Sequence, residues 1–184
     1  MVSGGCRWID EDTEPLPRTI YHRTKLQAEA LAEAAASATF TVRVLRMARC
    51  FPEPPDRMAM FRLHRGIDAR DVASAHAALL HDEGAPFQRY LACAPTPFRR
   101  EDCLQLAADP RQVLARRAPQ LLAEFERRGW PLPLSIDRVY DSSRMRAALG
   151  WQPRFGPEDV LQQYAAGSIE VLPRAEWIRD RVAE

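Results

Sequence analysis

Two short runs of strand-forming residues, separated by a helix-forming stretch, constrain the fold of this chain most. Residues 39–48 (TFTVRVLRMA) alternate and are rich in β-branched side chains, and residues 88–94 (QRYLACA) form a second candidate strand. Between them, VASAHAALL follows Asp71, which we expect to cap a helix. Strands that alternate with helices are typical of an α/β fold. A parallel sheet of two or three strands leaves faces and edges uncovered, so the sequence indicates part of a larger α/β fold.

Helix-forming patterns fill most of the rest of the chain. A run of Ala, Leu, Gln and Glu predicts a helix from Tyr21 to about Ser37, after a polar, proline-punctuated segment that we expect to be extended. Trp130 and Trp151 each follow a glycine, and we expect both rings to lie in the core. The second half is predicted to be mostly helical, over residues 99–108, 111–128, 141–149, 157–166 and 174–183.

Composition argues against several classes of function. The 26 basic and 25 acidic residues are mixed along the chain, so we expect no one-sided basic field for nucleic acid. No apolar stretch approaches membrane-spanning length and no signal peptide is visible, which makes the cytoplasm the expected location.

The four cysteines are widely spaced, without Cys-x-x-Cys or a nearby histidine at ligand spacing, and predict buried thiols rather than disulfides or a metal site. The eight glycines form no phosphate-binding loop between a strand and a helix.

One tyrosine and one lysine have the spacing of a catalytic pair. Lys25 is the only lysine among the 26 basic residues, and it follows Tyr21 by four positions, which places both side chains on one face of a helix. A guanidinium stays charged at any working pH, whereas an ammonium group is compact, can have its own pKa changed by its surroundings and can steer the proton of a neighbouring group. A nearby positive charge favours the ionised form of a phenol, which can then accept the proton of a substrate hydroxyl. Spacing alone also allows, and by itself favours, an exposed tyrosine beside a solvated lysine.

Five segments, in order along the chain, resemble the extended short-chain dehydrogenase/reductases, the NAD-dependent epimerase/dehydratase family. The segment TIYHRTKLQAEAL resembles the family's Tyr-x-x-x-Lys helix, and WIDEDTEPLP resembles the acidic, proline-containing loop before it. The segment TVRVLRMARCFPEP is similar to the strand and loop that follow, and HRGIDARDVASAHAAL to the next helix. The segment YDSSRMRAALGWQPRFGPEDVL resembles the carboxy-terminal pattern. The resemblance covers nearly the whole chain up to about residue 165.

The resemblance implies a fold, a cofactor and a partner. The expected fold is the carboxy-terminal part of a Rossmann-like, NAD(P)-binding α/β fold with a helical substrate-binding region. Residues 1–82 would be the remnant of the catalytic region, and residues 83–184 the substrate-binding region. The expected cofactor is NAD or NADP, the expected substrate is a nucleotide-sugar-like small molecule, and a homodimer is expected through the helix Tyr21–Ser37. We expect no nucleic acid and no membrane as partners.

The resemblance also assigns roles to residues. It implies that Tyr21 is the general acid/base and that Lys25 favours its ionised form and binds the nicotinamide ribose. Ser3 is a candidate for the family's third catalytic residue, although it lies closer to Tyr21 than the family pattern suggests.

Two further pairs are candidates for binding residues. Phe51 and Pro52, in the loop after the first strand, would border the nicotinamide or the substrate. His64 and Arg65 lie where relatives often hold a diphosphate, which suits the forked guanidinium.

The family's glycine-rich, dinucleotide-binding half has no counterpart in these 184 residues. We therefore expect either a fragment of an epimerase/dehydratase-type enzyme, a protein with a start assigned too far downstream, or a catalytically inactive remnant that serves as a binding or dimerisation module. On any of these readings, the isolated chain is expected to be a weak or inactive oxidoreductase, because the dinucleotide lacks its phosphate anchor.

Overall fold

Two small parallel sheets organise the chain. The computed structural model describes residues 5–171. Strand β2 (Val42–Met47) pairs in parallel with β3 (Phe87–Ala92), and β1 (Arg7–Ile9) pairs in parallel with β4 (Arg138–Tyr140). Each sheet therefore joins a strand from residues 1–82 to one from residues 83–184. The expected α/β class is confirmed.

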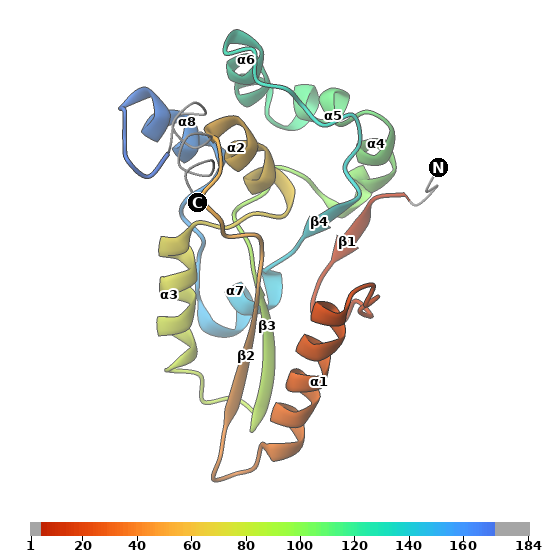
Figure 1. The fold of residues 1–184 in the computed structure, drawn as a ribbon, viewed down its shortest axis with the longest axis vertical. Helices are drawn as coiled ribbons and strands as arrows, with labels where there is room; N and C mark the ends of the chain where they lie inside the picture. Colours follow the sequence, from red (N-terminus) through yellow and green to blue (C-terminus); the bar gives the residue numbers. More distant parts are fainter. Residues whose placement is uncertain (1–4, 172–184) are drawn as a thin grey trace.

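Helices surround the two sheets. Figure 1 shows α1 and α3 on opposite sides of the β2–β3 pair, with α4 to α6 gathered beyond β1 and β4. The helices in the described part are α1 (Ile20–Ala35), α2 (Pro55–His64), α3 (Ala69–Leu79), α4 (Cys103–Ala108), α5 (Pro110–Arg117), α6 (Pro119–Arg127), α7 (Ser143–Leu149) and α8 (Pro157–Ala165). A 3₁₀ turn, η1 (Arg100–Asp102), precedes α4.

Proline explains two differences from the predicted elements. No helix is predicted from the sequence over α2, which begins in a segment with prolines at positions 52, 54 and 55. Pro55 stands at the first helical position, where its missing N–H costs nothing. The predicted helix 111–128 is two helices, since Pro119 cannot continue α5 and instead begins α6. The predicted helix 174–183 lies outside the described residues.

The expected cap of α3 was wrong by three residues. Asp68 is the cap, and its side chain accepts a hydrogen bond from the Arg70 N–H at 2.8 Å. Asp71 is buried in the first turn, where its two carboxylate oxygens accept from the backbone N–H groups of Arg154 at 2.9 Å and Phe155 at 3.0 Å. Asp71 therefore fastens α3 to the segment that leads into α8.

Two clusters of buried side chains form the core. One joins α2, α4, α5, α6, α8 and β4, with Phe125 and Val139 among its most buried members. The other lies around β3, α3 and α7 and contains Trp151, whose indole N–H donates to the Ser74 hydroxyl at 2.9 Å. Trp151 is therefore confirmed as a core residue, and the half-buried Trp130 packs edge-on against Phe125.

Helix α1 is held by charge rather than by apolar packing, since none of its 16 residues is fully buried. The Glu29 carboxylate lies 2.6 Å from the Arg46 guanidinium on β2 and 3.0 Å from the Arg89 guanidinium on β3. Glu33 adds a second contact to Arg89 at 3.3 Å. These ion pairs fix the direction of α1 and thereby place its first turns beside β1 and β4.

Candidate functional site

A hollow of about 630 Å³ opens between β1, β4 and the first turns of α1. Tyr21 and Lys25 both line it, from one face of α1, as do Met47 and Leu91 at the ends of β2 and β3. Its volume is in the range of cavities that hold small organic ligands. The hollow is the place in the described part of the chain where the predicted pair meets a ligand-sized space.

The β1–β4 pair forms one wall of the hollow. Arg7 stands opposite Arg138 and Ile9 opposite Tyr140, and all four line the hollow. Since successive side chains of a strand point to opposite faces, the intervening Val139 enters the core instead. This wall therefore presents two guanidinium groups at one end and an apolar and a phenolic side chain at the other.

The start of α1 positions the predicted catalytic pair. Thr19 caps the helix, and its hydroxyl accepts a hydrogen bond from the His22 N–H at 3.2 Å. Tyr21 follows in the first turn and is 67% exposed, and the Lys25 ammonium lies 5.8 Å from the centroid of its ring. In residues 5–171 the Tyr21 hydroxyl makes no hydrogen bond and Lys25 no ion pair. Both groups are therefore available to a ligand in the hollow.

The charges around the hollow leave an excess of positive groups. The Asp10 carboxylate accepts from the Thr13 hydroxyl at 2.7 Å and lies 2.8 Å from the Arg100 guanidinium, and these contacts lower the pKa of Asp10. Asp137 is paired with Arg138 at 2.6 Å. By contrast, Arg7 and Arg18 have no ion pair within the part of the chain that the structure describes. Unpaired guanidinium groups in a concave site favour an anionic ligand.

Phe51 and Pro52 do not line this hollow. Phe51 lies in the loop after β2 and is 63% exposed, with its ring centroid 4.9 Å from the Arg49 guanidinium carbon. The structure brings Tyr21 and Lys25 together, but it does not bring Phe51 or Pro52 into the same space. Ser3, the third expected catalytic residue, lies outside the described residues.

His64 and Arg65 also lie away from the lining. His64 is 4% exposed, and its Nδ1–H donates to the Arg138 carbonyl at 2.9 Å. Burial lowers the pKa of His64 to about 4, so its ring is neutral at physiological pH. The Arg65 guanidinium lies 3.7 Å from the Asp137 carboxylate, which does border the hollow. His64 therefore holds β4 by a hydrogen bond to the strand's backbone. Arg65 contacts the lining of the hollow only indirectly, through its ion pair with Asp137.

The comparisons with solved structures concern the fold. A UDP-glucuronic acid 4-epimerase from Bacillus cereus, solved with UDP-glucuronic acid and NAD, matches with a TM-score of 0.52 and 17% identity, over 86% of this chain and 55% of its own. A dTDP-glucose 4,6-dehydratase from Bacillus anthracis, solved with NAD, gives 0.50 and 15%, over 91% and 60%. RMD from Pseudomonas aeruginosa, solved with NADPH, gives 0.50 and 20%, over 83% and 57%.

The chain has the fold of the extended short-chain dehydrogenase/reductases. It spans little more than half the length of the solved structures that it matches, so the activity, substrates and partners of those proteins are proposals for this chain. No family model matches the sequence, and no curated protein matches it.

The wall made by β1 and β4 was not predicted from the sequence. Arg7, Ile9, Arg138 and Tyr140 belong to strands of only three residues each, which are too short to show a period of two. The available signal was the similar pattern of the two strands, RWI and RVY, each with an arginine first.

Residues 5–171 contain neither a metal site nor a membrane-spanning helix. No group of histidine, cysteine and carboxylate side chains there could hold a metal ion. No helix in that range combines the length and the apolar character needed to cross a membrane.

Proposed function

We propose that this chain carries the acid/base pair and part of the substrate site of an NAD(P)-dependent epimerase/dehydratase-type oxidoreductase. The observation that carries the proposal is the joint exposure of Tyr21 and Lys25 in a ligand-sized hollow, on a fold of the extended dehydrogenases. The comparisons do not favour the alternative of a catalytically inactive module.

Each member of the pair has a distinct role. The ionised Tyr21 phenol oxygen takes a proton from a substrate hydroxyl, and the hydroxyl so formed can return it. Lys25 places a positive charge next to the ring, where it stabilises the negative charge that develops on the phenol oxygen. The unpaired Arg7 and Arg18 suit the phosphates of a nucleotide-sugar-like substrate.

The hollow fits one end of the cofactor. The Tyr21 hydroxyl and the Lys25 ammonium are donors for ribose hydroxyls, and Ile9, Met47 and Leu91 offer apolar surface to a nicotinamide ring. Bound there, NAD or NADP would exchange two electrons with a substrate carbon. The residues from 5 to 171 contain no glycine-rich turn for the pyrophosphate. We therefore expect weak binding and slow turnover from this chain alone.

The test is a titration of the purified chain with NADH and with NADPH, followed by tryptophan quenching and energy transfer to the nicotinamide. We expect saturable binding that Lys25→Met weakens about tenfold, because a charged donor is lost. Arg23→Met, which removes a cation from the same helix outside the hollow, is the matched control and should bind as the parent chain does. Absence of binding, or equal effects of the two variants, would refute the proposed cofactor site.

The acid/base role needs its own measurement. We expect any turnover of a nucleotide sugar by the chain to fall about 10²–10⁴-fold in Tyr21→Phe, while cofactor binding is kept, since only the proton-transferring atom is lost. Tyr164→Phe, at a half-exposed tyrosine on α8, controls for the loss of a hydroxyl elsewhere. Unchanged turnover in Tyr21→Phe would remove Tyr21 from the mechanism.

We also propose a homodimer through the helix Tyr21–Ser37. The proposal rests on α1, which has no fully buried residue and presents Ala28, Leu31 and Ala35 at helical spacing on exposed positions. Leu31 is 73% exposed, which is unusual for a leucine in the middle of a helix. Small residues around a leucine allow two helices to approach closely.

A further inference from the structure

Three arginines and one aspartate gather at one end of the β1–β4 wall. The Asp137 carboxylate accepts two hydrogen bonds from the Arg138 guanidinium, from Nη2 at 2.6 Å and from Nε at 3.0 Å. The Arg65 guanidinium lies 3.7 Å from the other carboxylate oxygen of Asp137. Arg7 stands opposite Arg138 in the strand register, and its guanidinium has no ion pair in residues 5–171. The four side chains together carry an excess of two positive charges.

Main-chain hydrogen bonds hold this cluster in place. The Arg7 N–H donates to the Asp137 carbonyl at 2.9 Å, so β1 begins directly beside Asp137. The His64 ring, next to Arg65 in the sequence, donates to the Arg138 carbonyl at 2.9 Å and thereby ties the end of α2 to β4. The arrangement of the four charged residues therefore follows from strand pairing and from the contact between α2 and β4.

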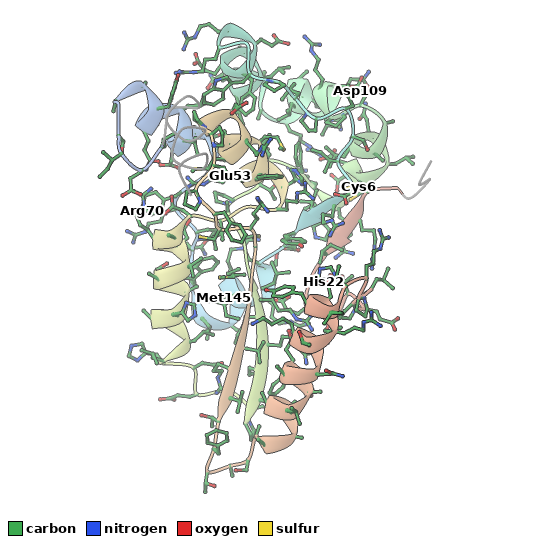
Figure 2. All side chains as sticks on the ribbon, in the orientation of Figure 1. Cys6, His22, Glu53, Arg70, Asp109 and Met145 are labelled. Atoms are coloured by element: carbon green, nitrogen blue, oxygen red, sulfur yellow. The ribbon has the colours of Figure 1, made fainter. Side chains whose placement is uncertain are left out.

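The cluster lies at the end of the hollow away from the predicted catalytic pair. Figure 2 shows Cys6, the residue before Arg7, at the end of β1 that points away from His22 on α1. Arg7, Asp137 and Arg138 line the same hollow as Tyr21. A ligand that spans the hollow would therefore meet Tyr21 at one end and the arginines at the other.

The two opposed arginines are incompletely neutralised. Neighbouring strands lie about 4.8 Å apart, so Arg7 and Arg138 bring two like charges close together, which is unfavourable without an anion between them. Asp137 is a single anion, and its side chain is 51% exposed. Exposed ion pairs add little stability, so another anion can replace Asp137 at small cost.

Asp137 is itself charged at neutral pH. Burial raises the pKa of Asp137, but its hydrogen bonds to Arg138 and the charges of Arg138 and Arg65 outweigh this effect, so the pKa is lowered overall. An ionised Asp137 competes with any anion that approaches the same guanidinium group.

We propose that Asp137 occupies the place of a ligand phosphate, and that a diphosphate group displaces it from Arg138. The diphosphate would bind Arg7 and Arg138, because a forked guanidinium matches phosphate oxygens and the cluster lacks two negative charges. Asp137 would thereby determine how tightly the hollow binds the anionic end of its ligand. The inference rests on the proposed function for the rest of that ligand, a nucleotide-sugar-like molecule, but its test needs no nicotinamide.

The test is isothermal titration calorimetry of the native chain with inorganic pyrophosphate. We expect Asp137→Asn to bind pyrophosphate about three- to tenfold more tightly than the parent chain, because the competing carboxylate is gone and Arg138 is free. Arg138→Met should weaken binding, and the gain from Asp137→Asn should vanish in the double variant, since the gain depends on the freed guanidinium. A misfolded variant would lose affinity rather than gain it.

Glu126→Gln is the matched control. Glu126 lies on α6, its side chain is 48% exposed, and it pairs with Arg111 outside the hollow. This variant changes the net charge of the chain as Asp137→Asn does, and should change the affinity for pyrophosphate by less than about twofold.

The proposal is overturned if Asp137→Asn binds pyrophosphate no more tightly than the parent chain, or if Glu126→Gln gains as much. It is equally overturned if the gain persists in the double variant without Arg138. Tighter pyrophosphate binding by Asp137→Asn, together with absence of NADH binding, would support this inference and refute only the proposed cofactor site.

Discussion

His64 carries a neutral imidazole inside the protein, between α2 and β4. Its Nδ1–H donates to the Arg138 carbonyl, and its Nε2 has no partner within the described residues. Burial lowers the pKa of His64 to about 4, compared with about 6.5 for a free histidine. The unfolded chain therefore binds a proton at a pH where the folded chain does not.

This difference predicts a stability that depends on pH. The contribution of a depressed histidine is complete above about pH 6.5 and is lost as the pH falls towards about 4, because only the unfolded state is protonated in that window. We expect the free energy of unfolding to fall by about 2–3 kcal/mol over this range, measured by urea denaturation. His64→Gln should flatten the dependence, whereas His76→Gln, at an exposed position on α3, should not. Parallel curves for all three proteins would contradict a buried neutral His64.

At the scale of elements, the attachment of α1 to the sheet depends on the Glu29 carboxylate. Burial raises the pKa of Glu29, but Arg46 and Arg89 together outweigh it, so the pKa of Glu29 is lowered overall. A lowered carboxyl pKa means that this contribution to stability is present at neutral pH and is lost as the pH falls through the folded value. The helix that presents Tyr21 and Lys25 is therefore attached to the sheet electrostatically.

We expect Glu29→Gln to release α1 while the rest of the chain stays folded. Amide hydrogen exchange along α1 should accelerate about tenfold, since a half-buried carboxylate shared by two guanidinium groups is lost. Glu33→Gln is the matched control, because Glu33 is more exposed and makes one longer contact to Arg89, at 3.3 Å. Its exchange should change by less than about twofold. Equal effects at the two positions would mean that Glu29 does not anchor the helix.

At the scale of the whole molecule, the surfaces around α1 have few partners. Strand β2 pairs only with β3 among the described strands, which leaves its other edge unpaired. Helix α1 covers one face of this pair without burying any of its own residues completely. Exposed strand edges and apolar helix faces favour association with another chain.

We predict that one substitution on α1 weakens the proposed homodimer. Leu31→Glu should weaken self-association of the chain at least about tenfold, because a charge would enter the apolar contact between two α1 helices. Sedimentation equilibrium over a range of concentrations measures this directly. Leu104→Glu changes a leucine on α4 that is even more exposed than Leu31, and should leave association unchanged. A monomeric parent chain at all concentrations would refute the dimer.

The sequence by itself determined the local parts of this protein. Helix propensity predicts α1, and the four-residue spacing brings Lys25 next to Tyr21, as confirmed by the distance of 5.8 Å. The β-branched pattern predicts β2, because a six-residue strand is long enough to show its alternation. These features depend on neighbours within a few positions of the chain, which a sequence displays directly.

Only the tertiary structure decided what surrounds Tyr21. The wall made by β1 and β4 joins two three-residue strands that lie far apart in the sequence, and neither strand has a local pattern strong enough to predict. Asp71 is a residue type that commonly caps helices, but its carboxylate is buried because it accepts hydrogen bonds from the backbone N–H groups of residues 154 and 155. His64 was expected at the substrate, whereas packing of α2 against β4 buries its ring. These contacts form between residues far apart in sequence, and their energies depend on burial that appears only when the chain has folded.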